Sequence, residues 1–410
     1  MRLTRRGVWM LTLGVVSILA AYVIGRTELV YLGSLLVLLP VGALVFLRAR
    51  PVRLGVDRRF TPAILSAGQV ATVSVEVHNL SRSWSADVAW RDVWPWYSTQ
   101  APSGRLPSLP PGGRLFAHRG QVLRYQVTPP RRGVFEIGPL RVAVDDPFGF
   151  AVRESDVGER HTVLVVPDVV PLPDTVHVIA ADDGSGRTLQ RQTASGVDDL
   201  MAREYRTGDA LRRVHWRASA HRGDLMVRQE EQRSHAEARI LLDTRRAGHR
   251  DASVDFEPES DSLEWAVRFT ASVGVHLKRC GFAVHIVETC PRQIAGLDHA
   301  QEFLASLAEV RLSDQPIADE ALSFSPGVSR SFGAMFAVLA DAEDDVVGRL
   351  VRAAPAFDTA VAFLVGRSNA ALAPPLRAAG WVCVAVGARD GLDDVWLDAA
   401  RALQAHRAGA

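Results

Sequence analysis

Two long uncharged apolar stretches near the N-terminus constrain this sequence more than any other feature. The first runs from Gly7 to Gly25 and the second from Leu29 to Leu47. Each is about 19 residues long, which is enough for a helix to cross the hydrocarbon core of a bilayer. Because only a few residues separate them, the sequence predicts a tight transmembrane hairpin within residues 1–50, integral to the membrane.

Arginines at the two outer ends of the hairpin predict its orientation. The short turn holds only Arg26 beside Glu28. The outer arginines are Arg2, Arg5, Arg6, Arg48, Arg50 and Arg53. The positive-inside rule then places both ends in the cytoplasm, so we expect a plasma-membrane protein with cytoplasmic soluble domains. The alternative is a secretory signal peptide, but a convincing cleavage site is missing and a second span follows at once.

Composition excludes several other classes of protein. The chain has 410 residues, 48% of them hydrophobic, and a formal net charge of +1. This is too apolar for a disordered chain, and it is long enough for two or three domains with cores of their own. Because basic and acidic side chains nearly cancel, we expect no nucleic-acid partner.

The three cysteines predict neither disulfides nor a zinc site. In a reducing cytoplasm Cys280, Cys290 and Cys383 are expected to be free thiols, each a small apolar core residue. The sequence has no Cys-x-x-Cys pair, and no histidine forms a metal-ligand repeat with the cysteines. A structural zinc site is therefore not expected.

Period-two alternation dominates residues 51–166. Val73, Val75 and Val77 alternate with polar residues, and similar short runs follow between Pro- and Gly-rich turns. This pattern predicts a β-sandwich of immunoglobulin-like architecture. Asp146 to Gly149 reads as a β-turn that carries a buried aromatic residue. Four tryptophans crowd one segment, either as core or as an exposed surface for lipid or a partner. They are Trp84, Trp90, Trp94 and Trp96.

Residues 167–235 form a polar linker followed by an Arg-rich segment. Within it, Asp209 is expected to cap the start of a helix, and Leu225 to Glu230 reads as a strand. Charges of both signs alternate here, which favours a paired polar network over a phosphate-binding groove.

This segment resembles the signature of the bacterial family called "domain of unknown function 58". The motif residues are Arg203, Tyr205, Gly208, Asp209, Arg213, Trp216, Arg228 and Glu230. The upstream Asp146–Gly149 turn and the paired spans also resemble the family layout. The resemblance implies a membrane-anchored protein with a von Willebrand factor A-like domain. It also implies a MoxR-type AAA+ ATPase and a transglutaminase-like membrane protein as associates. The family's activity is not established.

The signature also contains groups that could serve an uncharacterised hydrolase. Together these groups supply a base, an acid and an anion clamp. They are Arg203, Tyr205, Asp209, His215, Asp224 and Glu230. However, His215 shares a helical face with Leu211 and Val214, which is typical of a hydrogen-bonded core histidine. The same charged residues equally suit a structural ion network or a partner-binding surface, so we assign no catalytic residue.

Strand and helix patterns alternate through residues 236–410, which predicts a Rossmann-like α/β domain with a parallel sheet. With the preceding segments, the expected fold class is a multidomain α+β chain. Asp243 and Asp341 each end a predicted strand, where such sheets gather ligands. The run Gly-x-x-x-x-Gly-Lys-[Ser/Thr] is absent, so the chain itself is not expected to be a P-loop ATPase.

Asp243 stands where von Willebrand A domains hold a divalent ion through Asp-x-Ser-x-Ser. The two serine positions here hold Arg245 and Ala247. Two oxygen ligands are thus missing, and a hard cation needs several. We expect Asp243 to be at most a degenerate metal ligand, with an Arg245–Asp341 pair in place of the ion and no cofactor.

Two functions follow as hypotheses. The first is a non-catalytic membrane-tethered scaffold that binds protein partners, an AAA+ ATPase in particular. The second is an uncharacterised hydrolase that works from the signature residues. We favour the scaffold because no nucleophile–base pair is legible in the sequence and the recognisable ligand crevice has lost its metal-binding residues.

Overall fold

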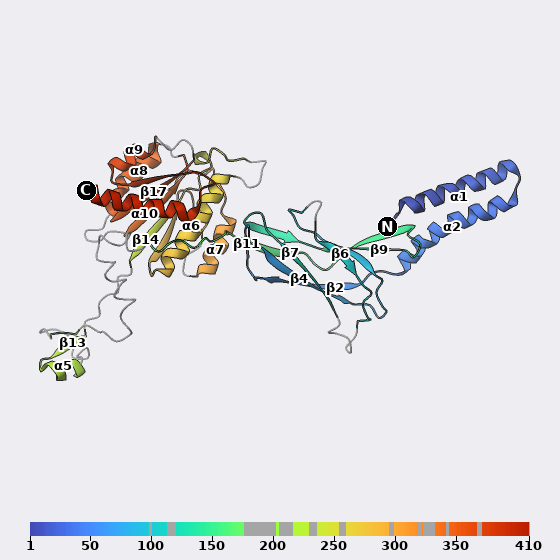
Figure 1. The fold of residues 1–410 in the computed structure, drawn as a ribbon, viewed down its shortest axis with the longest axis horizontal. Helices are drawn as coiled ribbons and strands as arrows, with labels where there is room; N and C mark the ends of the chain where they lie inside the picture. Colours follow the sequence, from blue (N-terminus) through green and yellow to red (C-terminus); the bar gives the residue numbers. More distant parts are fainter. Residues whose placement is uncertain are drawn as a thin grey trace. The chain divides into compact units, whose positions relative to one another are not determined.

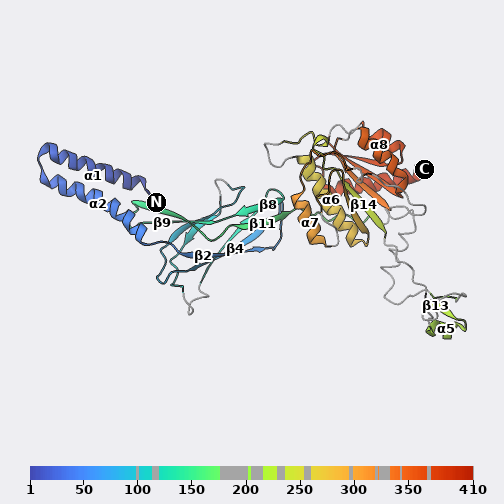
Figure 2. The same ribbon diagram turned by 180° about the vertical axis from the view of Figure 1, so that it is seen from behind.

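The structure, a computed structural model, contains two compact units, Met1–Val166 and Pro167–Ala410. Figure 1 and Figure 2 show a helical hairpin and β-sheets in the first unit, and a sheet covered by helices in the second. The described residues are 1–97, 101–112, 120–175, 202–204, 216–228, 236–253, 260–294, 299–318, 322, 333–341, 344–366 and 371–409.

Helices α1 (Arg5–Ile24) and α2 (Thr27–Ala49) are long and apolar enough to cross a membrane. Both views show them side by side (Figure 1, Figure 2). Gly14 and Gly33 lie at their contact, where a Cβ on Gly14 would be 2.9 Å from the Gly33 carbonyl oxygen. The two backbones therefore approach more closely than larger side chains permit, as is common between membrane helices.

The outer ends of the hairpin are joined to the β-sheets. Strand β1 (Arg2–Leu3) pairs with β10 (Ala151–Val157). Thr4 caps α1 by accepting from the Gly7 amide at 3.2 Å, and its hydroxyl donates to the Gly149 carbonyl at 2.6 Å. At the end of α2, the Arg153 guanidinium donates to the Leu47 carbonyl at 3.1 Å. The start of α1 and the end of α2 therefore lie at the same end of the hairpin.

The turn from Asp146 to Gly149 forms as expected, but its aromatic residue is exposed. The Asp146 carboxylate accepts from the amides of Phe148 at 2.9 Å and Ala151 at 2.5 Å. Phe148 is 63% exposed, and its ring stacks on Phe150. The expectation of a buried aromatic was wrong for Phe148, because the Asp146 turn places it at the tip. Phe150, one residue beyond the turn, packs against the core instead.

The β-strands of the first unit form three sheets that share one hydrophobic core. The sheet orders are β1-β10-β9-β5-β6, β2-β4-β7 and β3-β11-β8, with all pairs antiparallel except β3 with β11. Val73, Val75 and Val77 are fully buried, as the alternation predicts. The remaining strands are β2 (Leu54–Thr61), β3 (Leu65–Ser66), β4 (Ala71–Asn79), β5 (Val88–Asp92), β6 (Ser103–Leu106), β7 (Gln121–Val127), β8 (Gly133–Ile137), β9 (Leu140–Asp145) and β11 (His161–Val166).

Most of the tryptophan-rich segment belongs to this core. Trp90 and Trp94 are buried, and Trp96 packs edge-on against Phe135 with ring centroids 5.0 Å apart. Trp84 alone among the four is exposed, at 65%. The core interpretation of the cluster is therefore confirmed for three of the four residues, and a continuous aromatic surface is not formed by them.

An ion pair lies fully buried between β2 and β5. Arg58 donates to both carboxylate oxygens of Asp92, at 2.8 and 3.2 Å, and the Tyr125 hydroxyl donates to the same carboxylate. Burial raises the pKa of Tyr125 well above its ordinary value, and the Asp92 charge raises it further. Tyr125 therefore remains a neutral donor that helps to satisfy the buried charge.

The second unit is built on a five-stranded parallel sheet of order β15-β14-β16-β17-β18. One hydrophobic cluster packs α6, α7 and α10 on the sheet, and another packs α8 and α9. The expected strands and helices of this region are all confirmed. The strands are β14 (Glu237–Leu242), β15 (Ala283–Glu288), β16 (Ala334–Leu339), β17 (Thr359–Val365) and β18 (Val382–Val386); the helices are α6 (Asp261–Arg279), α7 (Ala300–Glu309), α8 (Asp344–Ala353), α9 (Ala373–Ala378) and α10 (Leu392–Gly409), with short 3-10 turns η2 (Arg246–Gly248) and η3 (Ala354–Ala356).

All three cysteines are free, as expected. Cys290 is buried, which agrees with a core role, whereas Cys280 and Cys383 are only half-buried. The core interpretation is therefore confirmed for Cys290 and confirmed in part for Cys280 and Cys383, which pack against the edges of the two cores.

Candidate functional site

Loops at the carboxyl ends of the parallel strands form the candidate site. Asp243 follows β14 directly and Asp341 follows β16 after one intervening residue. These two strands are neighbours, and the chain crosses the sheet in opposite directions on either side of them. In open α/β sheets this reversal point opens a crevice that binds ligands. The two aspartates thus lie where the fold favours a site.

Both carboxylate oxygens of Asp243 accept hydrogen bonds from side chains of the same chain. Arg245 donates from Nε to Oδ1 at 2.9 Å and from Nη2 to Oδ2 at 2.6 Å. The Thr289 hydroxyl, at the end of β15, donates to Oδ1 at 3.0 Å. Asp243 is 1% exposed and Arg245 is 5% exposed. This is a buried two-point ion pair, the strongest geometry that an arginine forms with a carboxylate.

The partner of Arg245 differs from the expectation. We expected a pair with the Asp341 carboxylate, but Arg245 pairs with Asp243 and reaches only the main-chain oxygen of Asp341, at 3.4 Å. The Asp341 carboxylate pairs instead with Arg250. Asp243 lies only two residues before Arg245, and its two carboxylate oxygens meet Nε and Nη2 of the guanidinium.

The Asp243 position does not fit a divalent ion in this arrangement. Both of its carboxylate oxygens accept from Arg245, and a metal there would lie against a guanidinium cation. The neighbouring Gly248 is close enough that a Cβ would lie 3.0 Å from Asp243 Oδ2, so little space remains on that side. In this crevice the Asp243 carboxylate is engaged in an internal ion pair.

Beside this pair an open pocket of ≈ 860 Å³ remains. Its walls come from the loop after β14, the start of α6, and the loops after β16, β17 and β18. Arg250 and Arg389 bring positive charge to its rim, and Asp341 and Asp390 bring negative charge. A pocket with both signs of charge suits a polar protein segment better than a single small anion.

One wall of the pocket contains a hydrogen-bonded network at the start of α6, in which Ser260, Ser262 and His249 are buried and Asp251 is exposed. Ser262 contacts His249 Nδ1 at 2.6 Å, and its amide donates to Asp251 at 2.8 Å. The Ser260 hydroxyl caps the helix and also donates to Asp251, at 2.9 Å. Burial acts to raise the pKa of Asp251, but the hydrogen bonds from Ser262 and Ser260 outweigh it and lower that pKa.

Hydrogen bonds fix the side chains of this network in place and leave none of them prepared for a reaction. The Asp243 carbonyl can only accept, so the Nε2 of His249 that contacts it at 3.1 Å carries a proton. The imidazole is thereby fixed between Asp243 and Ser262, with both nitrogens occupied. Sequence analysis did not single out His249, Asp251 or Ser262, because they become neighbours only when β14 and α6 pack together.

The structure places only part of the signature segment. Arg203 lies in β12 (Ala202–Glu204), which pairs with β13 (Met226–Arg228), so that Arg203 is opposite Val227 and Arg228 is opposite Ala202. Trp216 begins helix α5 (Trp216–Arg222) and is 69% exposed. Outside the described residues lie Tyr205, Gly208, Asp209, Arg213, His215 and Glu230, with the expected helix start.

Comparisons with known proteins support the resemblance in this region. Residues 201–317 match the family described as "Protein of unknown function DUF58". No curated protein matches the chain. A CARDB domain from Pyrococcus furiosus is 18% identical, with 28% of this chain and 88% of that chain covered and a TM-score of 0.19.

A superoxide reductase (neelaredoxin) from Ignicoccus hospitalis is 15% identical, with 29% of this chain and 83% of that chain covered and a TM-score of 0.17. Similarities of this size support no argument about activity, so the function must be argued from the site itself.

Proposed function

We propose that this protein is a membrane-tethered scaffold without catalytic activity of its own, and that its α/β unit binds a cytoplasmic protein partner. The observation that carries the proposal is the buried Arg245–Asp243 pair. It occupies the ligand position of the crevice from within the chain and leaves a rim of mixed charge around an open pocket.

The α/β unit on this view is a von Willebrand factor A-like domain that has exchanged its metal for an arginine. A metal-dependent domain of that kind would hold a divalent ion at the Asp243 position. Here the guanidinium is neutralised by Asp243, so docking would instead use the rim, where Arg250 is 72% exposed at its side chain. The partner we propose is a MoxR-type AAA+ ATPase, because the signature segment resembles a family with that association.

The hairpin supports a cytoplasmic location for both units. Thr4 and Arg153 tie the outer ends of α1 and α2 to the same β-sheet, so these ends lie on one side of the membrane. The outer arginines of the hairpin lie on that side as well. Positive charge beside a span favours the cytoplasm, which supports a cytoplasmic location for the β-sheets.

Affinity purification tests the partner. Full-length protein would be solubilised in detergent from its own cells, with and without ATP, beside a variant with Arg250→Ala and Arg389→Ala. We expect nucleotide-dependent recovery of an AAA+ ATPase with the wild type and about tenfold less with the variant, since interface arginines often dominate affinity.

Arg401→Ala is the matched control. Its side chain is also 72% exposed and also pairs with an aspartate, Asp398, but it lies on α10 away from the pocket lining. Equal loss with Arg401→Ala would show that the effect is one of general charge. Failure to recover an ATPase in either nucleotide state would contradict the proposed partner and direct attention to the hydrolase hypothesis.

A further inference from the structure

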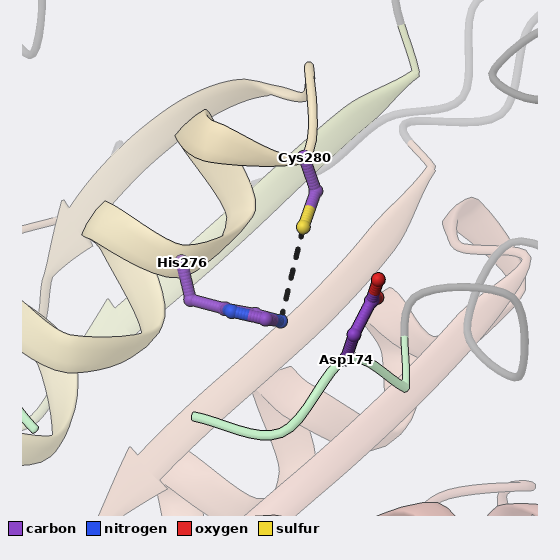
Figure 3. A group of neighbouring side chains, drawn as sticks. All are labelled: Asp174, His276 and Cys280. Carbon is purple, nitrogen blue, oxygen red and sulfur yellow. Dashed lines mark hydrogen bonds between the residues drawn. The ribbon is translucent and has the colours of Figure 1, made fainter. Parts of the chain in front are cut away.

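A second group of reactive side chains lies away from the crevice, at the end of α6. His276 and Cys280 are four residues apart on this helix and therefore lie on one face. Figure 3 shows them projecting from successive turns, with Asp174 reaching the same space from a separate segment of the chain. One metal-binding atom from each residue lies within 4.8 Å of the other two.

We propose that Asp174, His276 and Cys280 form a zinc-binding site. Thiolate, imidazole and carboxylate are the three ligand types that proteins use for Zn²⁺, and three protein ligands leave a fourth position for water. Neither the signature segment nor the crevice uses these residues. The site also departs from the expectation of no zinc, which overlooked the His276-x-x-x-Cys280 spacing.

The distances are close to those of a bound ion. Cys280 Sγ and His276 Nε2 are 3.9 Å apart. A tetrahedral zinc ion with bonds of about 2.3 Å to sulfur and about 2.0 Å to nitrogen holds the two atoms about 3.5 Å apart. A small side-chain rotation closes this difference. Asp174 is exposed, so its carboxylate can complete the site without moving the buried core.

Neighbouring contacts hold the ligands in position. The ring of Trp396 meets His276 edge-on, with centroids 5.7 Å apart, and its Nε1 donates to the Pro173 carbonyl at 3.2 Å. One buried tryptophan on α10 therefore supports the imidazole and also fixes the residue before Asp174. Supporting groups of this kind orient ligands and raise metal affinity.

The segment that carries Asp174 is itself fastened to α6. Asp168 pairs with Arg268 at 3.2 Å, and the Val170 amide donates to the Ser272 hydroxyl at 3.0 Å. Leu172 is buried in the core of the unit. These contacts hold the segment against α6 and thereby position Asp174 beside the helix.

The charge distribution around the cluster favours a cation. Asp174 brings a carboxylate to the side chains of His276 and Cys280. Cys280 also caps the carbonyl end of α6, where positive charge is stabilised. A dication satisfies the carboxylate, the thiolate and the helix end together.

Cobalt and zinc titrations of the detergent-solubilised full chain test the site. After metal removal under a non-thiol reductant, Co²⁺ should produce a thiolate-to-metal charge-transfer band, and one equivalent of Zn²⁺ should displace it. Cys280→Ser should abolish the band. His276→Ala and Asp174→Asn should each weaken Zn²⁺ binding by at least about tenfold.

Cys383→Ser is the matched control, since Cys383 is also half-buried but lies in β18 beside main-chain carbonyls. It should leave the titration unchanged. The proposal is overturned if saturating Co²⁺ gives the wild type no charge-transfer band, or if Cys280→Ser retains it. Asp174 is exposed, so Asp174→Asn should fold normally; unchanged Zn²⁺ affinity in that folded variant would remove Asp174 from the site.

Discussion

At the scale of single residues, the chemistry of the crevice depends on which carboxylate group pairs with Arg245. The sequence shows an arginine two positions after Asp243 and predicted that it would pair with Asp341. That prediction was wrong, because the sequence does not show the course of the loop that brings Arg245 to Asp243. The short turn after β14 decides it, since Arg245 lies two residues from Asp243 and meets both of its oxygens.

Substitution of Arg245 tests whether the guanidinium replaces an ion. Arg245→Ser leaves Asp243 buried without its charge partner, which should reduce the free energy of unfolding by about 3–5 kcal/mol. If Mg²⁺ can occupy the vacated space, added Mg²⁺ should restore part of this loss in the variant and change nothing in the wild type. Denaturant unfolding with and without Mg²⁺ measures both effects.

Arg245→Lys is the informative companion, because an ammonium group keeps the charge but cannot donate in the same two-point geometry. It should lose less stability than Arg245→Ser and should not respond to Mg²⁺. Calorimetric Mg²⁺ binding by the wild-type protein that disappears in Asp243→Asn would contradict the replacement and reinstate a metal site.

At the scale of elements, the helical hairpin shows how small residues determine the packing of two helices that are apolar enough to cross a membrane. Lipid is as apolar as leucine, so association relies on close contact instead of burial from water. Gly14 of α1 and Gly33 of α2 lie at this contact, whereas Gly7 of α1 lies close to the Phe150 main chain. The apolar stretches predicted the two helices, but they could not show which face of each helix meets the other.

Enlarging one of these glycines should separate the helices. Gly14→Leu introduces side-chain atoms where the Gly33 carbonyl and the Val37 side chain already lie within 3 Å of a Cβ. We expect a loss of about 1–3 kcal/mol from overpacking, measured as a lower unfolding midpoint in detergent.

The control is Gly42→Leu on α2, because a Cβ at Gly42 meets nothing within 4 Å. That variant should unfold within about 0.5 kcal/mol of the wild type, as surface substitutions usually do. If Gly14→Leu and Gly42→Leu reduce the free energy of unfolding equally, the loss arises from helix propensity and not from the contact between the helices.

At the scale of the whole molecule, the chain contains two units with separate hydrophobic cores. The first unit has one core and the second has two, on the opposite faces of its sheet. Because no single core spans Val166 and Pro167, each unit should be a cooperative folding unit of its own.

A fragment of residues 167–410 should therefore fold in water without detergent. We expect its unfolding midpoint to match one of two transitions of the full chain. Circular dichroism of the fragment and calorimetry of both proteins check this. A fragment that aggregates or lacks cooperative unfolding would mean that the first unit is required for the second to fold.

The sequence by itself determined the local structure of this protein. Apolar length, period-two alternation and the alternation of strand and helix patterns each depend on neighbours along the chain, so the two apolar helices, the β-strands and the parallel sheet were all predictable. The exposure of Phe148 was not, because it depends on where one turn lies relative to the sheet.

Only the tertiary structure decided which distant side chains meet. Asp174 is about a hundred residues from His276, and Asp251 and Ser262 belong to different elements, so no spacing rule joins them. The preference of Arg245 for Asp243 likewise follows from the course of a loop. Local patterns arise from the repeat of the backbone, whereas sites arise from packing, which brings together residues that the sequence keeps apart.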